Sequence, residues 1–131
     1  MAGAIHRYLS EDHHRLDGLL ARAVAAEPID APAYEAFRAG LLRHIAIEEK
    51  VLFVEARARR GGERLPVIAR LHADHAALAS LLVPPPTHTL LRTIREILDE
   101  HNPIEEGERG FYDTCEQLAG SDLEGARDDA I

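Results

Sequence analysis

Histidines and glutamates interrupt the apolar stripes of this sequence at helical spacing. The stretch "LLRHIAIEEKVLF", residues 41–53, carries His44 and Glu48 four positions apart, and "HNPIE" repeats the pair as His101 and Glu105. Residues four apart on an α-helix share one face, with their side chains about 6 Å apart. Each pair therefore turns an imidazole and a carboxylate toward the side of the helix that should be buried, and both groups are metal ligands.

Two further histidines stand at equivalent places on other apolar stripes. His13 lies in "DHHRL" and His75 in "DHAAL", and each of these segments is followed by an H-x-x-x-E-E segment. The chain thus repeats one pattern twice, as two similar helix pairs. Packing of the two pairs would bring four histidines and two glutamates together.

Such a cluster requires a cation. An unpaired buried carboxylate is strongly destabilising for a domain whose total stability is roughly 5–15 kcal/mol. A pair of divalent or trivalent metal ions would compensate, with the carboxylates bridging and neutral imidazoles capping each ion. Nitrogen and oxygen ligands favour iron or manganese, with zinc as an alternative. Cys115 is the one cysteine, which excludes an internal disulfide and a Cys-based zinc or iron–sulfur site.

Four helices are expected to position these residues. The apolar periodicity predicts helices over residues 10–26, 33–60, 66–83 and 87–118. Ser10 is predicted to cap the first helix, and Gly61 and Gly62 to stop the second. No segment shows strand-type alternation and the connections are short, so we predict an all-α, up-down-up-down four-helix bundle.

Length and charge limit the remaining possibilities. We expect one domain over residues 1–118 and an acidic, mobile tail over residues 119–131 of the 131-residue chain. The formal net charge of −8 argues against nucleic acid or an anionic membrane as a partner. The sequence shows no membrane-spanning apolar run and no signal-peptide pattern, so we expect a soluble protein of the reducing cytoplasm.

The ordered motifs resemble the hemerythrin-like (HHE cation-binding) family. The order is H, then H-x-x-x-E, then H, then H-x-x-x-E, with "DHxxL" and "EExxLF" flanks, over about residues 10–118. The resemblance implies a non-haem di-iron centre in a four-helix bundle, with a solvent-derived oxo or hydroxo bridge. It also implies that two histidines hold each iron and two glutamates bridge them: His13 and His44 on one iron, His75 and His101 on the other, and Glu48 and Glu105 between them.

The sequence departs from the oxygen-carrying members of that family. These carry two histidines four apart on the third helix, whereas Leu71 occupies the upstream position here. His72 is a candidate fifth imidazole or a surface residue. The carriers also use an aspartate five residues after the last histidine, where this chain has Glu106; we favour Glu105 by internal symmetry. The set of four histidines and two glutamates looks closer to the di-iron domains linked to nitrosative stress and iron–sulfur repair.

The other polar residues near the motifs receive structural interpretations. Glu49 is expected to point into solvent, and Tyr112 and Cys115 to pack in the core on the side of the fourth helix that carries His101. Tyr112 follows His101 by three turns, which is too far for it to be a ligand. Pro103 is expected to kink that helix locally. Asp12 and Asp74 directly precede candidate ligands, so each either hydrogen-bonds to an imidazole or supplies helix-terminal charge. Surface positions are expected for three further histidines: His6, His14 and His88.

Three functions fit these features. The first is binding of a small diatomic ligand, O2 or NO, at the di-iron site for sensing, storage or a stress response. The second is a redox enzyme or an iron–sulfur repair protein, although no acid or base is evident beyond the ligands. The third is a structural or regulatory module that the metal only stabilises. The sequence identifies no protein partner.

Overall fold

The computed structural model describes residues 3–63 and 65–119, and every regular element in these ranges is helical. The elements are α1 (Ala4–Ala25), α2 (Ala31–Ile47), the π-helical η1 (Glu48–Leu52), α3 (Phe53–Arg59), α4 (Pro66–Leu81) and α5 (His88–Glu106). Residues 111–119 form a further helical segment. None of the helices in the described ranges is both long and apolar enough to cross a membrane.

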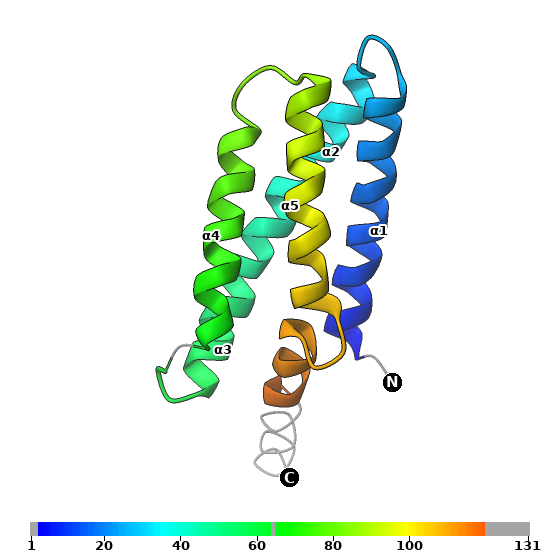
Figure 1. Cartoon of the computed structure of the whole chain (residues 1–131). Coiled ribbons are helices and arrows are strands. Elements are labelled where there is room, and N and C mark those ends of the chain that lie inside the picture. Colours follow the sequence, from blue (N-terminus) through cyan, green and yellow to red (C-terminus); the bar gives the residue numbers. More distant parts are fainter. Residues whose placement is uncertain (1–2, 64, 120–131) are drawn as a thin grey trace.

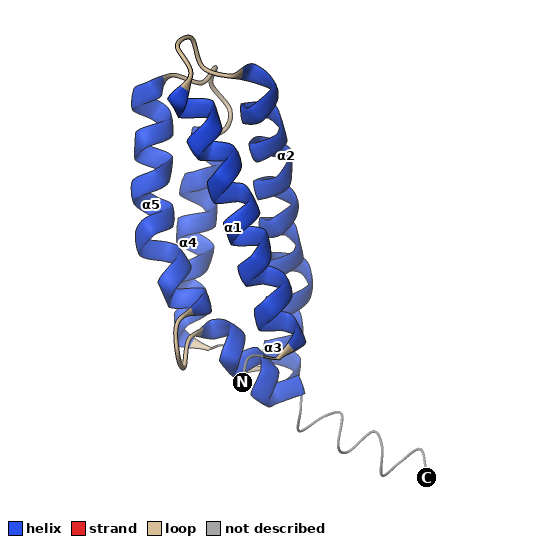
Figure 2. Cartoon of the chain, turned by 90° about the vertical axis from the view of Figure 1, so that its right-hand side faces the viewer, coloured by secondary structure: helices blue, strands red, loops and turns tan. Residues whose placement is uncertain are grey.

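The long helices form the predicted antiparallel four-helix bundle (Figures 1 and 2). α2, η1 and α3 follow one another without a break and together make the second helix of the bundle. The π-helical turn at Glu48–Leu52 widens the spiral at one of the two H-x-x-x-E-E segments. Such π-bulges are often found at functional sites because they re-aim side chains locally.

The first helix begins earlier than the sequence predicts. It starts at Ala4, and Ser10 lies inside it with its hydroxyl 3.4 Å from His6 Nδ1. The Glu116 carboxylate accepts hydrogen bonds from the backbone N–H groups of Ile5 and His6, the latter at 3.1 Å. The prediction that Ser10 is the N-cap was therefore wrong, because the first turn is satisfied by a residue more than a hundred positions away.

The boundaries of the second helix follow local chemistry. The Asp30 side chain caps α2 by accepting a hydrogen bond from Ala33 N at 3.1 Å. After α3, Gly61 and Gly62 have φ angles of 69° and 93°, which L side chains rarely adopt. The predicted stop at these glycines is confirmed.

The fourth helix is shorter than predicted. α5 ends at Glu106, and Gly107 N donates to Pro103 O at 2.9 Å to close its last turn. Gly110 N then donates to Gly107 O at 2.9 Å, and helix resumes at residue 111. The continuous helix predicted to residue 118 is therefore wrong, because the sequence "GERG" turns the chain. The tail predicted over residues 119–131 lies, beyond residue 119, outside the described residues.

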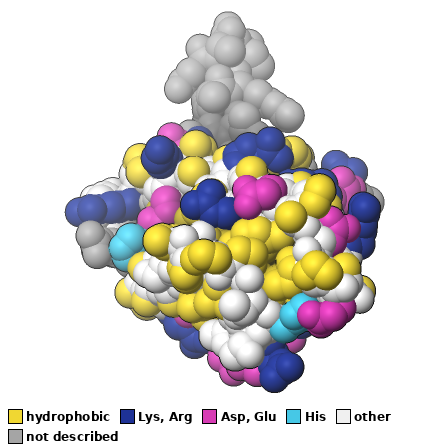
Figure 3. Space-filling model, turned by 90° about the horizontal axis from the view of Figure 1, so that it is seen from above, with side chains coloured by type: hydrophobic (Ala, Val, Ile, Leu, Met, Phe, Trp, Pro, Cys, Tyr) yellow, Lys and Arg dark blue, Asp and Glu magenta, His cyan; other side chains and the backbone are white. Residues whose placement is uncertain are grey.

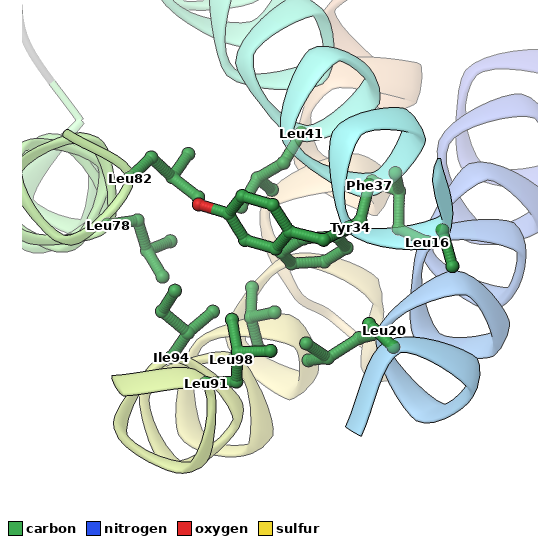
Figure 4. Close-up of a cluster of buried hydrophobic side chains, with 12 residues drawn as sticks. Leu16, Leu20, Tyr34, Phe37, Leu41, Leu78, Leu82, Leu91, Ile94 and Leu98 are labelled. Atoms are coloured by element: carbon green, nitrogen blue, oxygen red, sulfur yellow. The ribbon is translucent and has the colours of Figure 1, made fainter. Parts of the chain in front are cut away.

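Two apolar clusters fill the bundle. The upper cluster, at the upper end of Figure 1, is drawn in Figure 4. It consists of Leu16, Leu20, Ala23, Ala33, Tyr34, Phe37, Leu41, Leu78, Leu82, Leu91, Ile94 and Leu98. The lower cluster consists of Leu9, Leu52, Phe53, Ala56, Ile68, Leu71, Phe111, Tyr112 and Cys115. Each candidate metal ligand lies between residues of the two clusters along the bundle, so the polar layer is enclosed by apolar layers.

The end of the bundle that carries the α1–α2 and α4–α5 connections has a mixed surface. Figure 3 looks onto this end and shows hydrophobic side chains among charged groups of both signs. The candidate ligands do not lie on this surface but are buried in the interior of the bundle.

Candidate metal centre

Six polar side chains are buried in the described part of the chain, and they are the six principal ligands predicted from sequence. They are His13 (6% exposed), His44 (2%), Glu48 (0%), His75 (3%), His101 (2%) and Glu105 (0%). They come from α1, α2, η1, α4 and α5. All four bundle helices therefore contribute to one interior cluster.

The Glu105 carboxylate reaches histidines of both helix pairs. Its Oε1 lies 3.2 Å from His13 Nε2, and its Oε2 lies 3.1 Å from His101 Nε2 and 3.7 Å from His75 Nε2. A carboxylate with one oxygen toward each helix pair has the disposition of a bridging ligand.

Glu48 occupies a similar position. Its Oε1 lies 3.4 Å from His44 Nε2 and 3.2 Å from His75 Nε2, which belong to different helix pairs. The Nε2 atoms of all four histidines thus face the two carboxylates. The cluster has two carboxylates at its middle and two imidazoles on each side.

A second carboxylate stands behind each imidazole, on its Nδ1 atom. Three of these pairs are hydrogen-bonded: His44 with Asp12 at 2.8 Å, His101 with Asp74 at 2.9 Å, and His75 with Glu49 at 2.7 Å. The fourth, His13 with Glu106 at 3.3 Å, is a looser contact without a hydrogen bond. An outer carboxylate on Nδ1 fixes the ring orientation and leaves the Nε2 lone pair to face the centre. Imidazoles held in this way are oriented for metal binding once Nε2 has lost its proton.

The outer carboxylates follow the internal repeat. Asp12 and Asp74, which precede His13 and His75, each accept from the histidine of the other helix in their own pair. Glu49 and Glu106, which follow the two candidate bridging glutamates, each reach a histidine in the opposite pair. The centre therefore has approximate two-fold symmetry.

The donor atoms fit a pair of cations. Buried atoms without a hydrogen-bond partner in the described residues include Glu48 Oε1, His75 Nε2 and Glu105 Oε2, all within the cluster. Two groups of donors lie close enough together to hold an ion each: His13, His44 and Glu105 in one, and Glu48, His75, His101 and Glu105 in the other. Leaving such polar atoms unpaired in an apolar interior is unfavourable, and bound cations would satisfy them.

Comparison with known proteins also indicates a cation-binding domain. Residues 4–120 match the family model described as the hemerythrin HHE cation binding domain. The chain belongs to the hemerythrin HHE family. A search of curated proteins and a search of solved structures each found no match.

In the absence of a metal ion, the buried carboxylates and imidazoles of the cluster shift one another's pKa values. Burial and the neighbouring Glu105 carboxylate raise the pKa of Glu48 well above its usual range. Burial also acts to raise the pKa of Glu105, but the neighbouring Glu48 and His101 side chains hold it well below its usual range. Although burial opposes protonation of His75, the Glu105 and Glu48 carboxylates beside its Nε2 raise its pKa to about 10. Metal binding must therefore displace protons.

The two alternative ligand candidates, His72 and Glu106, lie at the edge of the cluster. His72 is 67% exposed, and its Nδ1 lies 2.8 Å from Glu49 Oε1, outside both donor groups. Glu106 is 29% exposed and stands behind His13. The geometry thus gives Glu105 the central position. In the described part of the chain, the hydrogen bond that links His72 to the cluster is the one with Glu49, which also holds His75.

Two residues of the centre were interpreted wrongly from the sequence. Glu49 was expected to point into solvent, but it accepts a hydrogen bond from His75. Tyr112 is packed in the core as expected, but it is not too far from the ligands: its hydroxyl lies 3.1 Å from His13 Nε2 and 3.0 Å from Glu48 Oε2. The sequence did contain an indication for Glu49, because Glu49 and Glu106 are the last residues of the two H-x-x-x-E-E segments. No spacing rule signals Tyr112, because a turn separates it from α5.

The remaining residues predicted to lie on the surface or to fill the core differ in their contacts and burial. His6 and His88 hydrogen-bond to backbone carbonyls, at 2.7 Å to Glu106 and 3.1 Å to Ala26, and His14 is exposed. Cys115 is buried in the lower cluster, and burial together with the charge of Glu48 raises the pKa of its thiol to about 12. Cys115 is thus an uncharged apolar filler, as predicted.

Proposed function

We propose that this hemerythrin-family protein holds two iron ions and binds a small diatomic ligand, O2 or NO. The proposal rests above all on one observation, the layer of four inward Nε2 atoms around two carboxylates. His13 and His44 would hold one ion, His75 and His101 the other, and Glu48 and Glu105 would bridge. When bound, an iron pair supplies redox-active centres with positions open to an exogenous ligand.

The donor set supports iron over softer metals. All six principal candidates present nitrogen or oxygen, and Cys115 lies outside both donor groups. Imidazole and carboxylate suit iron and manganese, and zinc also accepts them. Iron and manganese can change oxidation state, whereas zinc cannot. A function that depends on redox chemistry therefore requires iron or manganese.

The lining of the cavity supports a small apolar ligand. Leu16, Leu41 and Leu78 are buried and line the cavity at the cluster beside the histidines. Such an apolar wall suits an uncharged diatomic molecule.

Anaerobic iron loading tests the proposal. Purified protein loaded with Fe²⁺ should hold two ions per chain by elemental analysis. Brief exposure to O2, and separately to NO, should change the visible absorption spectrum, and removal of the gas should restore it. A spectrum that neither gas alters would defeat diatomic binding, and fewer than two ions per chain would defeat the dinuclear assignment.

Zinc provides the matched control. Zn²⁺ should occupy the same residues and stabilise the fold, but its spectrum should not respond to either gas. Peroxide turnover above that of free iron would instead favour a redox enzyme. If zinc-loaded protein retained every biological activity, the metal would have only a structural role.

A further inference from the structure

The Tyr112 hydroxyl lies among the candidate ligands of one ion. It is 3.1 Å from His13 Nε2, 3.2 Å from His44 Nε2, 3.0 Å from Glu48 Oε2 and 3.2 Å from Glu105 Oε1. Tyr112 is fully buried in the lower cluster. Its ring lies 5.7 Å from that of His13, tilted by 33°. The oxygen thus faces the donors of the first helix pair.

The single proton of a phenol can be donated to only one of these four neighbours. All four nitrogen or oxygen atoms lie within 3.2 Å of the hydroxyl, so the other three contacts need further protons or a cation. A cation among these atoms would satisfy all of them together, since each presents a lone pair toward it.

The two halves of the centre differ at this point. The donor group of the second ion contains Glu48, His75, His101 and Glu105, and that of the first contains His13, His44 and Glu105, to which the proposed Glu48 bridge adds a fourth donor. On the second side, the apolar ring of Phe53 stacks on His75 at 5.7 Å with an interplanar angle of 7°. The first side has an additional oxygen, the Tyr112 hydroxyl, among its donors.

We propose that Tyr112 Oη is a further ligand of the ion held by His13, His44 and Glu105, and that the two ions are therefore inequivalent. The inference rests on the proposed iron centre. A phenol oxygen is a hard donor and gives up its proton to solvent when it binds as phenolate, which favours Fe³⁺ over Fe²⁺ or Zn²⁺. The iron beside Tyr112 would thus be the one more readily kept ferric.

Ferric protein provides the test. Phenolate bound to Fe³⁺ produces a visible charge-transfer band and resonance-enhanced phenolate ring vibrations. The wild-type ferric protein should show both. Tyr112→Phe keeps the buried ring and removes only Oη, so it should retain two ions per chain and lose the band and the vibrations. Tyr34→Phe is the matched control, because Tyr34 is buried in the upper cluster, and it should retain both signals.

The outcomes separate the two proposals. Wild-type protein with two ferric ions but no phenolate vibrations would overturn the Tyr112 assignment and leave the iron centre intact. Signals that persist in Tyr112→Phe would overturn it as well. Failure to bind iron would overturn both proposals. The wild-type Raman measurement decides the question even if Tyr112→Phe does not fold.

Discussion

The Asp12 carboxylate on α1 accepts a hydrogen bond from Nδ1 of His44 on α2, at 2.8 Å. Asp74 stands in the same relation to His101, at 2.9 Å. Each aspartate thus aims an imidazole that belongs to the next helix of the bundle. The helix that contributes one histidine to the cluster also orients the histidine of its neighbour, so the packing of each pair and the metal geometry depend on each other.

Asp12→Asn should weaken metal binding without removing a ligand. The amide is a poorer partner for the His44 N–H than the carboxylate, and loss of such an outer partner lowers metal affinity by about 10–100-fold. Competition with a chelator of known affinity, using Zn²⁺ to avoid redox changes, measures this difference. Asp74→Asn should behave similarly because of the internal symmetry.

Asp99→Asn provides the matched control for Asp12→Asn, since Asp99 is an exposed aspartate on α5. Its affinity should equal that of the wild type. Equal affinities in the control, in Asp12→Asn and in Asp74→Asn would show that the outer carboxylates do not orient the imidazoles.

Glu48→Gln and Glu105→Gln should differ in the metal-free protein. Burial and the Glu105 carboxylate raise the pKa of Glu48 because they disfavour its charged form, so a neutral glutamine should change the free energy of unfolding by less than about 1 kcal/mol. The lowered pKa of Glu105 keeps it charged, and its stabilising effect is present above its unfolded pKa of about 4.3 and lost as the pH falls. Glu105→Gln should therefore cost about 3 kcal/mol at pH 7.

Urea unfolding of chelator-treated protein at pH 7 measures both effects. Both variants should bind fewer than two ions per chain, because each loses a bridging carboxylate. Equal losses of stability in the two variants, or a metal-free chain without a cooperative transition, would contradict the predicted asymmetry.

The sequence predicted the bundle and the six central residues because they obey helix periodicity. His44 and Glu48, for instance, share a face of one helix. The errors occur where the local rules end. The first helix is capped by Glu116, which no local pattern reveals. Glu49 lies in the π-helical turn, where side-chain directions depart from the 3.6-residue period. Tyr112 is placed by a turn that ends the periodicity of α5.

Metal affinity should fall as the pH falls. In the metal-free chain His75 has a pKa of about 10. The pKa of His13 is also raised: burial opposes this, but the carboxylates of Glu105 and Glu106 outweigh it. At pH 7 an entering ion must displace the proton of His75, so the affinity should drop about tenfold per pH unit on acidification. Calorimetric Zn²⁺ titrations at pH 6, 7 and 8 in two buffers would measure the release, and a pH-independent affinity would refute it.

His72→Ala should leave the number of bound ions unchanged. His72 is largely exposed and meets the centre only through Glu49, so it is predicted to be no ligand. The variant should hold two ions and keep the ferric spectrum of the wild type. His75→Ala, which removes a buried candidate ligand three residues along α4, should hold fewer ions. A ferric spectrum altered by His72→Ala alone would instead support the five-histidine site.

Gly110→Ala should disturb the turn that delivers Tyr112. A Cβ at Gly110 would lie 2.7 Å from Ile104 O, 2.8 Å from Gly107 O and 2.9 Å from Glu105 O, and backbone oxygens cannot move aside individually. The turn must shift, which should lower the free energy of unfolding by about 1–3 kcal/mol.

Tyr112 lies two residues beyond Gly110, so the shift should also weaken its phenolate band in the ferric protein. Gly18→Ala is the matched control, because a Cβ there meets no atom within 4 Å. Gly18 lies within α1, where alanine should stabilise the helix by about 0.5–1 kcal/mol. If Gly110→Ala were as stable as Gly18→Ala and kept the full band, the turn would not be what positions Tyr112 against the centre.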